Sequence, residues 1–398
     1  MANSLTGIEI QDSRLLLWFP LPYRVLSLII AGVWAWGLNL QYLYSLRIDV
    51  AALIKYERQG APKIPMHTSA YTLASILTAI LVLNIIIFWR YTGVNIEGVK
   101  NGQMLPGLLL LGLLIVLVLP FNILHKNGRY RFLRNIRRIA FGYIDREQRF
   151  SDLLLADVLT SYAKVLGDIW ICSCMFLTGM SSTSAPERQC GGTYMLPFII
   201  ALPSAIRLRQ CLIEYHRASD RPYSDRKPHL YNALKYSSAF PVILFSAMQN
   251  TSDSNSASIT GTTALYKLWL ISVLVNSFFS FYWDVARDWD LSLFSSSRAN
   301  PEHPFGLRQI MMFPAPSVYY CAIFLDCLLR LTWSLKLSPH LDRYGDLEGG
   351  IFILQFLEIF RRWVWIFFRV ETEWTRVEPR NSNDIMLSEF PPYKSDSD

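Results

Sequence analysis

The 398-residue sequence is poor in charged residues, which make up only 17% of it. Soluble globular domains carry roughly 25%. Apolar residues take their place, at 52% of the chain, with a mean hydropathy of +0.24. They form long uninterrupted blocks, several of which reach the roughly 20 residues that a helix needs to cross a bilayer. This shortage of charge excludes a soluble protein and predicts an integral membrane protein.

Motifs for common enzyme chemistry are also missing. The sequence has no Walker A, HExxH or CxxC motif, and its six His have no metal-ligand spacing. Asp284 and Asp288, one turn apart, could suggest the carboxylate site of a metal-dependent glycosyltransferase, but no nucleotide-sugar domain accompanies them. We therefore expect no enzyme activity, no metal and no cofactor.

Six cysteines are too few for a disulfide framework in a chain of this size. Five lie in or beside apolar blocks and are interpreted as small buried hydrophobes; they are Cys172, Cys174, Cys211, Cys321 and Cys327. Cys190 lies in a predicted luminal loop with no obvious partner. The net charge of +7 resides in loops between apolar blocks, so nucleic acid is not an expected partner.

The fold class predicted from these blocks is all-α, a polytopic membrane helical bundle with about nine transmembrane helices. The expected spans are 17–44, 70–92, 104–124, 153–179, 195–214, 230–249, 263–285, 317–335 and 350–369. The chain then divides into an N-terminal segment (1–16), a three-helix membrane region (17–124), a basic amphipathic cytosolic linker (125–151), a six-helix domain (152–371) and a disordered cytosolic tail (372–398).

Orientation follows from the loops, because Lys and Arg concentrate on the cytosolic side. They are most abundant in 45–69, 125–151, 215–229, 286–316 and the tail. The segment 125–151 predicts an amphipathic helix, with Phe132, Leu133, Ile136 and Ile139 on one face. It either lies on the anionic leaflet or only enforces topology, and the two are compatible. Asn250 begins an Asn-Thr-Ser triplet on the luminal side, a candidate glycosylation acceptor.

Ionisable residues recur inside the last six spans and are almost missing from the first three. These ionisable residues, with the polar or aromatic side chains beside them, are Asp157, Ser161, Lys164 and Asp168 in the fourth span; Arg207, Gln210 and Glu214 in the fifth; Lys235 beside Tyr236 in the sixth; Asp284 and Asp288 in the seventh; Asp326, Arg330 and Trp333 in the eighth; and Glu358, Arg361 and Arg362 in the ninth. A charge at mid-membrane costs about 2.5–3.5 kcal/mol.

Eight of these residues would together cost roughly 20–28 kcal/mol if they faced lipid unpaired, so we expect them to converge on an interior site. They are Asp157, Arg207, Lys235, Asp284, Asp288, Arg330, Arg361 and Arg362. The alternative is that they are ion pairs that only hold the bundle together. That alternative is strongest for Asp168, Lys164, Glu214, Asp326 and Glu358, each of which could simply orient a neighbouring cation.

The signs of these eight charges indicate the ligand. Five cations and three carboxylates predict a net positive but mixed site. Arginine forks match oxyanions in bidentate fashion, and carboxylates weaken binding enough for release. Phosphate at neutral pH still carries a proton that an Asp can accept, whereas sulfate does not. The mixture therefore favours phosphate over sulfate.

At these same residues the sequence resembles the EXS family, which includes eukaryotic phosphate exporters that are also retrovirus receptors. The matching segments are ADVLTS (156–161), RLRQCLIEYHRASD (207–220), PHLYNALKYSSAF (228–240), YWDVARDWDL (282–291), YYCAIFLDCLLRLTW (319–333) and LEIFRRWVWIFFRVE (357–371). They occur in the family's order, and the three preceding spans look like the family's preceding helices.

The resemblance implies an EXS-type transporter whose last six helices line a phosphate pathway. Phosphate coordination would fall to Arg207, Lys235, Tyr236, Arg330, Arg361 and Arg362. Asp157, Asp284, Asp288 and Glu358 would orient them along the pathway, and Trp333 would be a gate or wall. Thr160 stands where exporters commonly have Asn, which could retune the site. No SPX domain precedes the spans, so regulation by inositol pyrophosphates is not expected.

The short form without an SPX domain looks like the fungal ER-retention-defective proteins. That subgroup implies a multi-pass Golgi membrane protein, cycling with the ER, that returns luminal phosphate to the cytosol and supports retention of glycosyltransferases and luminal ER proteins. Expected partners are inorganic phosphate and membrane lipids, and a homodimer is also compatible. The rival hypothesis is a non-transporting sorting adaptor that binds glycosyltransferase cytosolic tails or coat proteins through 125–151 and the acidic tail.

Overall fold

The computed structural model describes residues 15–56, 65–122, 124–143, 145, 147–179, 186–188, 190–254, 259–295, 304–332 and 348–389, without the side chains of 250–254, 259–262 and 378–389. Within these ranges the chain is helical and has no strand. The main helices are α2 (Leu21–Ser45), α4 (Met66–Thr92), α6 (Met104–Val118), α7 (Lys126–Phe141), α8 (Arg149–Ser161), α9 (Ala163–Thr178), α10 (Met195–Arg217), α11 (Tyr223–Ser237), α12 (Ala239–Ser254), α13 (Ile259–Trp283), α14 (Pro316–Arg330) and α16 (Glu348–Glu389).

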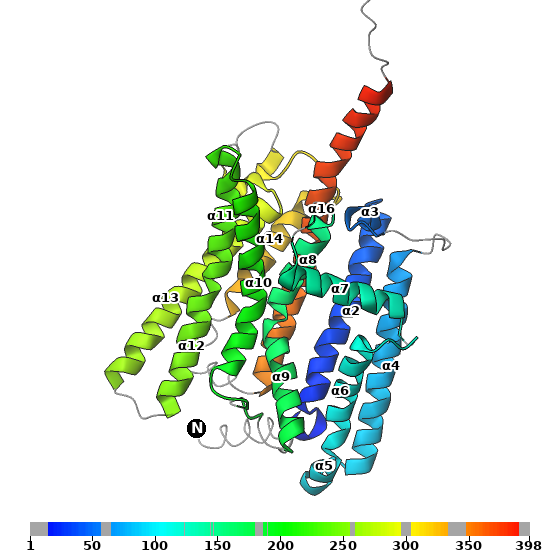
Figure 1. Cartoon of the computed structure of the whole chain (residues 1–398), viewed down its shortest axis with the longest axis vertical. Helices are drawn as coiled ribbons and strands as arrows, with labels where there is room; N and C mark the ends of the chain where they lie inside the picture. Colours follow the sequence, from blue (N-terminus) through cyan, green and yellow to red (C-terminus); the bar gives the residue numbers. More distant parts are fainter. Residues whose placement is uncertain are drawn as a thin grey trace, which may run out of the picture.

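Short elements complete the fold. They are the α-helices α3 (Val50–Leu53) and α5 (Ile96–Gly102), the π-helical turn η1 (Asp284–Asp288), which continues α13, and the 3₁₀ turns η2 (Ser292–Phe294) and η4 (Pro304–Gly306). Most long helices run along the vertical axis of Figure 1, and α7 crosses the bundle. The result is the all-α polytopic membrane bundle that the sequence predicted.

Five helical segments of the described chain are long and apolar enough to cross a bilayer: Leu21–Ser45, Met66–Thr92, Ile96–Val118, Met195–Arg217 and Thr263–Asp288. The number nine therefore stays a prediction. The remaining predicted spans are shorter, broken or rich in charge. α14 has 15 residues, and α16 carries the charges of Glu358, Arg361 and Arg362.

Two predicted spans are each split into a pair of helices. The fourth span breaks at Tyr162, between α8 and α9. The Tyr162 hydroxyl donates to the Leu28 carbonyl of α2 at 3.2 Å, and a Cβ on Gly32 would lie 1.8 Å from that hydroxyl. The sixth span breaks at Ser238, which donates to the Lys235 carbonyl at 2.7 Å. Both breaks fall one turn or less after a buried polar side chain, Ser161 in the first case and Lys235 in the second.

The helix predicted within the basic linker is present as α7. Its Arg129 binds carbonyls at the end of α6, including that of Leu119 at 2.9 Å, and its Arg138 pairs with Asp152 of α8. Ile139 is buried, whereas Phe132 of the same predicted apolar face is 40% exposed. Binding of α7 to the leaflet stays a prediction.

Cys174 was interpreted as a small buried hydrophobe and Cys190 as a loop cysteine without an obvious partner. Both interpretations were wrong, because the two residues form a disulfide. Cys174 lies near the end of α9, and the following loop returns to bring Cys190 within a Cα–Cα distance of 6.1 Å. Trp170 of α9 also donates its indole N–H to the Cys190 carbonyl at 3.1 Å. A separation of 16 residues in the sequence does not by itself predict that the two cysteines lie close together. Cys172, Cys211, Cys321 and Cys327 are free.

The C-terminal helix differs from its prediction. α16 continues to Glu389, through residues 372–389 that were predicted to be disordered, and extends past the other helices in Figure 1. A buried contact explains the continuation: Glu371 pairs with Arg308 and accepts a hydrogen bond from Tyr319. These contacts hold the helix where the apolar span ends. Residues 390–398 lie outside the described chain, as do Trp333 and the side chain of Asn250.

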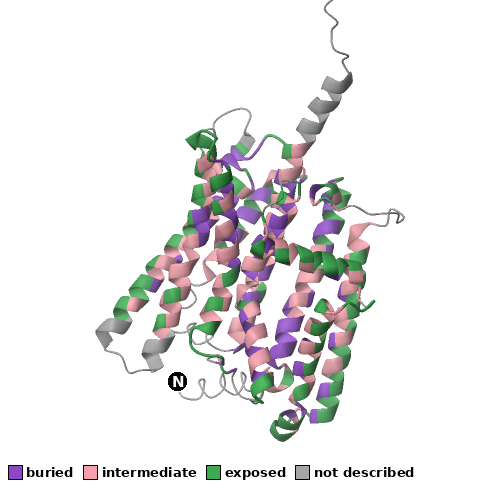
Figure 2. Cartoon of the chain, in the orientation of Figure 1, coloured by how far each residue is buried: buried purple, intermediate pink, exposed green. Residues whose placement is uncertain are grey.

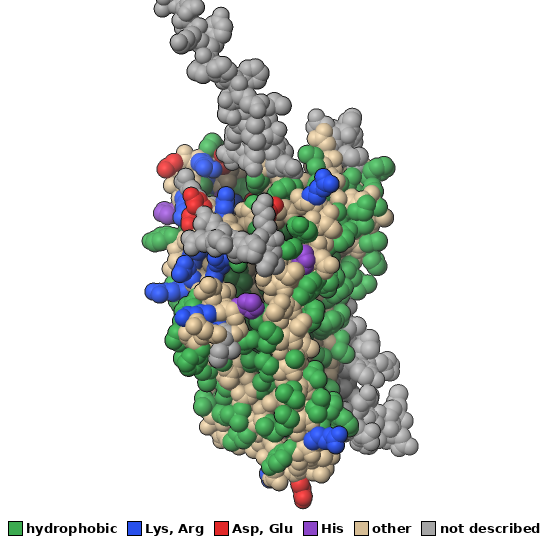
Figure 3. All heavy atoms as spheres, turned by 90° about the vertical axis from the view of Figure 1, so that its right-hand side faces the viewer, with side chains coloured by type: hydrophobic (Ala, Val, Ile, Leu, Met, Phe, Trp, Pro, Cys, Tyr) green, Lys and Arg blue, Asp and Glu red, His purple; other side chains and the backbone are tan. Residues whose placement is uncertain are grey.

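Burial and surface follow the pattern of a membrane protein. Buried residues concentrate where α2, α8, α9, α10 and α16 meet, and outer faces are exposed (Figure 2). Exposed side chains on α4 and α13 include Leu83, Ile271 and Phe278, each more than half exposed. Figure 3 shows hydrophobic side chains over most of one face and cations gathered toward its upper end. That end is the one that the loop charges predict to be cytosolic.

Candidate functional site

Polar side chains from six helical segments meet inside the bundle, and we call them the central cluster. Its members are Asp157 (α8), Arg207 (α10), Lys235 and Tyr236 (α11), Asp284 and Asp288 (η1), Asp326 and Arg330 (α14), and Glu358, Arg361 and Arg362 (α16). Every predicted site residue is among them except Trp333, which lies outside the described chain. The structure therefore brings together side chains up to 205 residues apart in sequence, from Asp157 to Arg362.

Asp284 is the hub of the cluster. Its carboxylate is completely buried and meets three cations: Lys235 Nζ at 3.0 Å, Arg361 Nη1 at 3.4 Å, and Arg330. Lys235 also lies 3.4 Å from Asp288, one turn further along the π-helical turn. These three contacts make Asp284 the point at which the charges of α11, α14 and α16 meet.

Arg361 and Arg330 link α14 to α16. Arg361 contacts Asp326 at 3.0 Å and Glu358 at 2.6 Å, and Arg330 contacts Asp326 at 3.1 Å. Arg361 is only 4% exposed, so its guanidinium depends on these carboxylates in place of water.

A second arginine centre lies between α8, α10 and α11. Arg207 donates through Nε to Asp157 at 2.6 Å, and through its other nitrogens to Gln210 at 2.7 Å and to the Tyr236 hydroxyl at 3.1 Å. Tyr236 in turn donates to Asp157 at 2.5 Å. The guanidinium carbon of Arg207 lies 4.7 Å from the centre of the Tyr236 ring. The phenol and the carboxylate together fix the orientation of this cation.

Arg362 is different, because its hydrogen bonds go to hydroxyl groups. Nε donates to Ser161 at 2.9 Å and Nη2 donates to Thr160 at 3.2 Å, while the guanidinium lies 4.5 Å from the Trp365 ring. Arg362 is 7% exposed, and no carboxylate in the described part of the chain lies within 4 Å of its nitrogens. It is a buried cation without a paired anion.

The charge balance differs from the expectation. The eight residues that we weighed carry five cations and three carboxylates, but the structure adds Asp326 and Glu358, so five cations face five carboxylates. The predicted net positive site was therefore wrong for the cluster as a whole. In the described chain, Lys235, Arg330 and Arg361 contact four carboxylates between them, so Arg362 is the cluster's one cation without a carboxylate contact. The spacing of Asp326 and Arg330, one helical turn, was the signal that their charges belong together.

Other residues considered from the sequence lie elsewhere. Glu214 pairs with Arg149 and with His229 at 3.2 Å, away from the central cluster. Lys164 is exposed. Asp168 belongs to a second buried group. Thr160, Ser161 and Gln210, which we did not assign to the site, contribute hydrogen bonds to its arginines. In the described residues no group of three or more His, Cys, Asp or Glu could hold a metal ion.

Comparison with protein families gives a match to the EXS family model over residues 19–375. The chain belongs to the EXS family. The match includes every helix that contributes to the central cluster.

Individual relatives fall into two groups. The chain is 29% identical to Protein ERD1 homolog 2 of Schizosaccharomyces pombe, over 88% of this chain and 95% of the relative. It is 30% identical to Protein ERD1 homolog 1 of the same organism, over 89% and 91%. Human Solute carrier family 53 member 1 is 30% identical over 65% of this chain but only 37% of the carrier. The two fission yeast proteins thus match this EXS protein along nearly their whole length.

Proposed function

We propose that this EXS protein is a carrier, not an enzyme, that moves inorganic phosphate from the Golgi lumen to the cytosol. Phosphate released in the lumen by glycosylation would thereby be recovered, and retention of glycosyltransferases and luminal ER proteins would be supported. The similarity to a solute carrier supports transport, and the similarity to the ERD1 homologs supports the ER and Golgi setting.

The observation that carries the proposal is Arg362. In the described part of the chain, the hydrogen bonds of this buried guanidinium go to Thr160 and Ser161, so it can exchange these hydroxyls for the oxygens of an anion without leaving one of the described carboxylates unpaired. Hydroxyls are also donors, so they remain useful partners for the bound oxyanion. Arg362 is thus the cation of the cluster that an entering phosphate can bind without displacing a carboxylate.

The neighbouring ion pairs explain how binding and release can both occur. Asp284, Asp326 and Glu358 occupy the positions on Arg330, Lys235 and Arg361 that phosphate oxygens would take. Exchange of one anion for another keeps each arginine paired throughout, which avoids the cost of a bare buried charge. The carboxylates form ion pairs with these cations again as the phosphate leaves. The arrangement suits passage of an anion better than tight storage.

The test is phosphate flux into proteoliposomes that contain the purified full-length protein. Arg362→Gln should lower flux at least tenfold while the thermal midpoint stays close to wild type, because no paired carboxylate is stranded. Arg376→Gln serves as the matched control, since its ion pair with Asp290 is exposed and lies outside the cluster, and its flux should be unchanged.

The sorting-adaptor hypothesis predicts the opposite pattern. Arg362→Gln would then have no effect on retention of glycosyltransferases in cells, whereas changes on the exposed face of α7, such as Arg134→Gln, would disturb it. Absence of phosphate flux from well-folded wild-type protein would rule out the carrier proposal.

A further inference from the structure

A second group of buried charges lies toward the opposite end of the bundle from α7, where α2 and α16 begin and α9 ends (Figure 1). We call it the luminal cluster, because the loop charges predict that this end faces the lumen. Its members are Arg24 (α2), Asp168 (α9), Arg188 in the loop after α9, and Glu348 and Gln355 (α16).

Two arginines and two carboxylates alternate in the luminal cluster. Glu348 contacts Arg24 Nη1 at 2.9 Å and Arg188 Nη2 at 2.8 Å. Arg188 also contacts Asp168 at 3.3 Å, and Gln355 donates to Asp168 at 2.6 Å. Arg24, Asp168, Glu348 and Gln355 are each at most 6% exposed. Only the Arg188 side chain, 33% exposed, reaches the surface.

The luminal cluster and the central cluster follow one another along α16. Gln355 of the luminal cluster lies one turn before Glu358 of the central cluster. On the facing helices, Asp168 lies two turns after Ser161, which donates to Glu358 at 2.8 Å. We call this row of polar side chains between α8–α9 and α16, from Arg188 to Arg362, the seam. Each buried charge in it is expensive inside a membrane.

Arg24 gives the seam a site for a ligand. Only its Nη1 is engaged, by the side chain and carbonyl of Glu348. Its Nε and Nη2 are buried and have no hydrogen-bond partner in the described part of the chain. These two nitrogens form one edge of the guanidinium plane, the fork that binds two oxygens of a carboxylate or phosphate. Arg24 is only 2% exposed, so burying these two nitrogens without hydrogen-bond partners has a free-energy cost.

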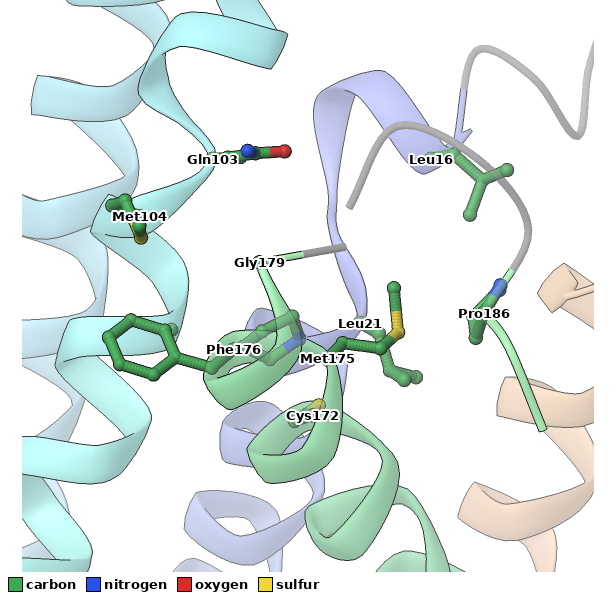
Figure 4. A pocket seen from close by; sticks show the side chains of 11 residues that line it. Leu16, Leu21, Gln103, Met104, Cys172, Met175, Phe176, Gly179 and Pro186 are labelled. Atoms are coloured by element: carbon green, nitrogen blue, oxygen red, sulfur yellow. The ribbon is translucent and has the colours of Figure 1, made fainter. Parts of the chain in front are cut away.

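A cavity lies at the same end of the bundle, although Arg24 itself does not line it. It has a volume of about 40 Å³ and is lined by Leu21 of α2, Cys172 and Met175 of α9, and Pro186 of the loop (Figure 4). Leu21 lies one turn before Arg24, Cys172 one turn after Asp168, and Pro186 two residues before Arg188. Such a volume accommodates a few water molecules, so water can reach residues within one helical turn of Arg24 along α2.

We propose that Arg24 and Arg188 form a second, luminal binding site for a tetrahedral oxyanion, from which phosphate passes along the seam to Arg362. The inference rests on the proposed transport for its biological role. The disulfide between Cys174 and Cys190 holds Arg188, two residues away, over the end of α9. Arg188 receives the anion at the surface and Arg24 holds it by the free fork.

The first experiment measures how flux depends on phosphate concentration at the luminal face of oriented proteoliposomes. Arg24→Lys keeps the charge that pairs with Glu348 but removes the fork. The half-saturating phosphate concentration should rise about tenfold, as expected for one lost charge-assisted hydrogen bond, with the maximal rate within twofold of wild type. Arg138→Lys is the control and should change neither quantity. An unchanged half-saturating concentration in Arg24→Lys overturns the proposal.

The second experiment measures equilibrium binding of inorganic phosphate by calorimetry and does not depend on transport. Arg362→Gln should retain one weak binding event, and Arg362→Gln with Arg24→Lys should lose it. Sulfate should compete for this event, because it is also a tetrahedral oxyanion. If Arg362→Gln binds no phosphate, the luminal site is refuted. If the event is present in a wild-type protein without flux, the site stands and the carrier proposal fails.

Discussion

The first three long helices and the later ones are held together in different ways. Helices α2, α4 and α6 contact each other through aliphatic and aromatic side chains, such as the edge-to-face pair of Tyr23 and Phe88, and through the Tyr71 ring of α4, which packs on Gly37 of α2. Helices α8 to α16 meet around the buried ion pairs of the central cluster. The first region buries a single ion-paired charge of its own, Arg24, whereas the second buries a whole cluster of them.

The difference reflects what a membrane offers as solvent. Lipid tails are as apolar as Leu, so hydrophobic burial does little to draw helices together. Close packing at small residues is one solution and polar contacts are another. The polar solution is expensive in free energy, and it is found in the region where we propose a path for an anion. Arg24 is the exception in the first region, since it is a buried charge of α2 that joins the polar seam.

The largest effect on stability is expected when the Asp284 carboxylate, the hub of the central cluster, is removed. Asp284→Asn leaves Lys235, Arg330 and Arg361 without their shared carboxylate, which should cost about 3–5 kcal/mol of stability and lower the thermal midpoint in detergent. Asp288→Asn removes a single contact at 3.4 Å and should have a much smaller effect. Equal shifts for the two variants would contradict the role of Asp284 as the hub.

An intermediate effect is expected at the disulfide beside the luminal cluster. Cys174→Ser should destabilise the protein by about 3 kcal/mol, the value for a closed loop of similar length. A reducing agent should shift the midpoint of the wild-type protein by the same amount and leave the variant unchanged. Cys321→Ser, a free and exposed cysteine, is the control. Insensitivity of the wild-type protein to reduction would show that the bond contributes nothing.

The smallest effect tests close packing in the uncharged region. A Cβ on Gly37 of α2 would lie 2.7 Å from the Tyr71 ring of α4, whereas a Cβ on Gly112 of α6 meets nothing within 4 Å. Gly37→Leu should therefore cost about 1–3 kcal/mol through overpacking, measured as a lower thermal midpoint. Gly112→Leu should be neutral. If both variants are neutral, α2 and α4 do not depend on their close approach.

Local sequence patterns were sufficient to predict some features of the structure and not others. The apolar blocks predicted the long helices, and the ionisable residues inside the last six spans predicted which parts of the chain meet at the interior site. The breaks at Tyr162 and Ser238 were not predictable, because they depend on contacts with α2 and α13. The continuation of α16 past residue 371 likewise depends on Arg308 and Tyr319, which are distant in sequence.

The sequence by itself determined that this chain is a membrane helical bundle and that its later helices carry charges that must face inward, since both follow from the cost of polar groups in lipid. Only the tertiary structure decided which charges pair. It placed Asp326 and Glu358 on Arg361 and two hydroxyl groups on Arg362, and among the described residues it left Nε and Nη2 of Arg24 without a hydrogen-bond partner. Pairing depends on the positions of several helices at once, and no spacing within a single helix encodes that.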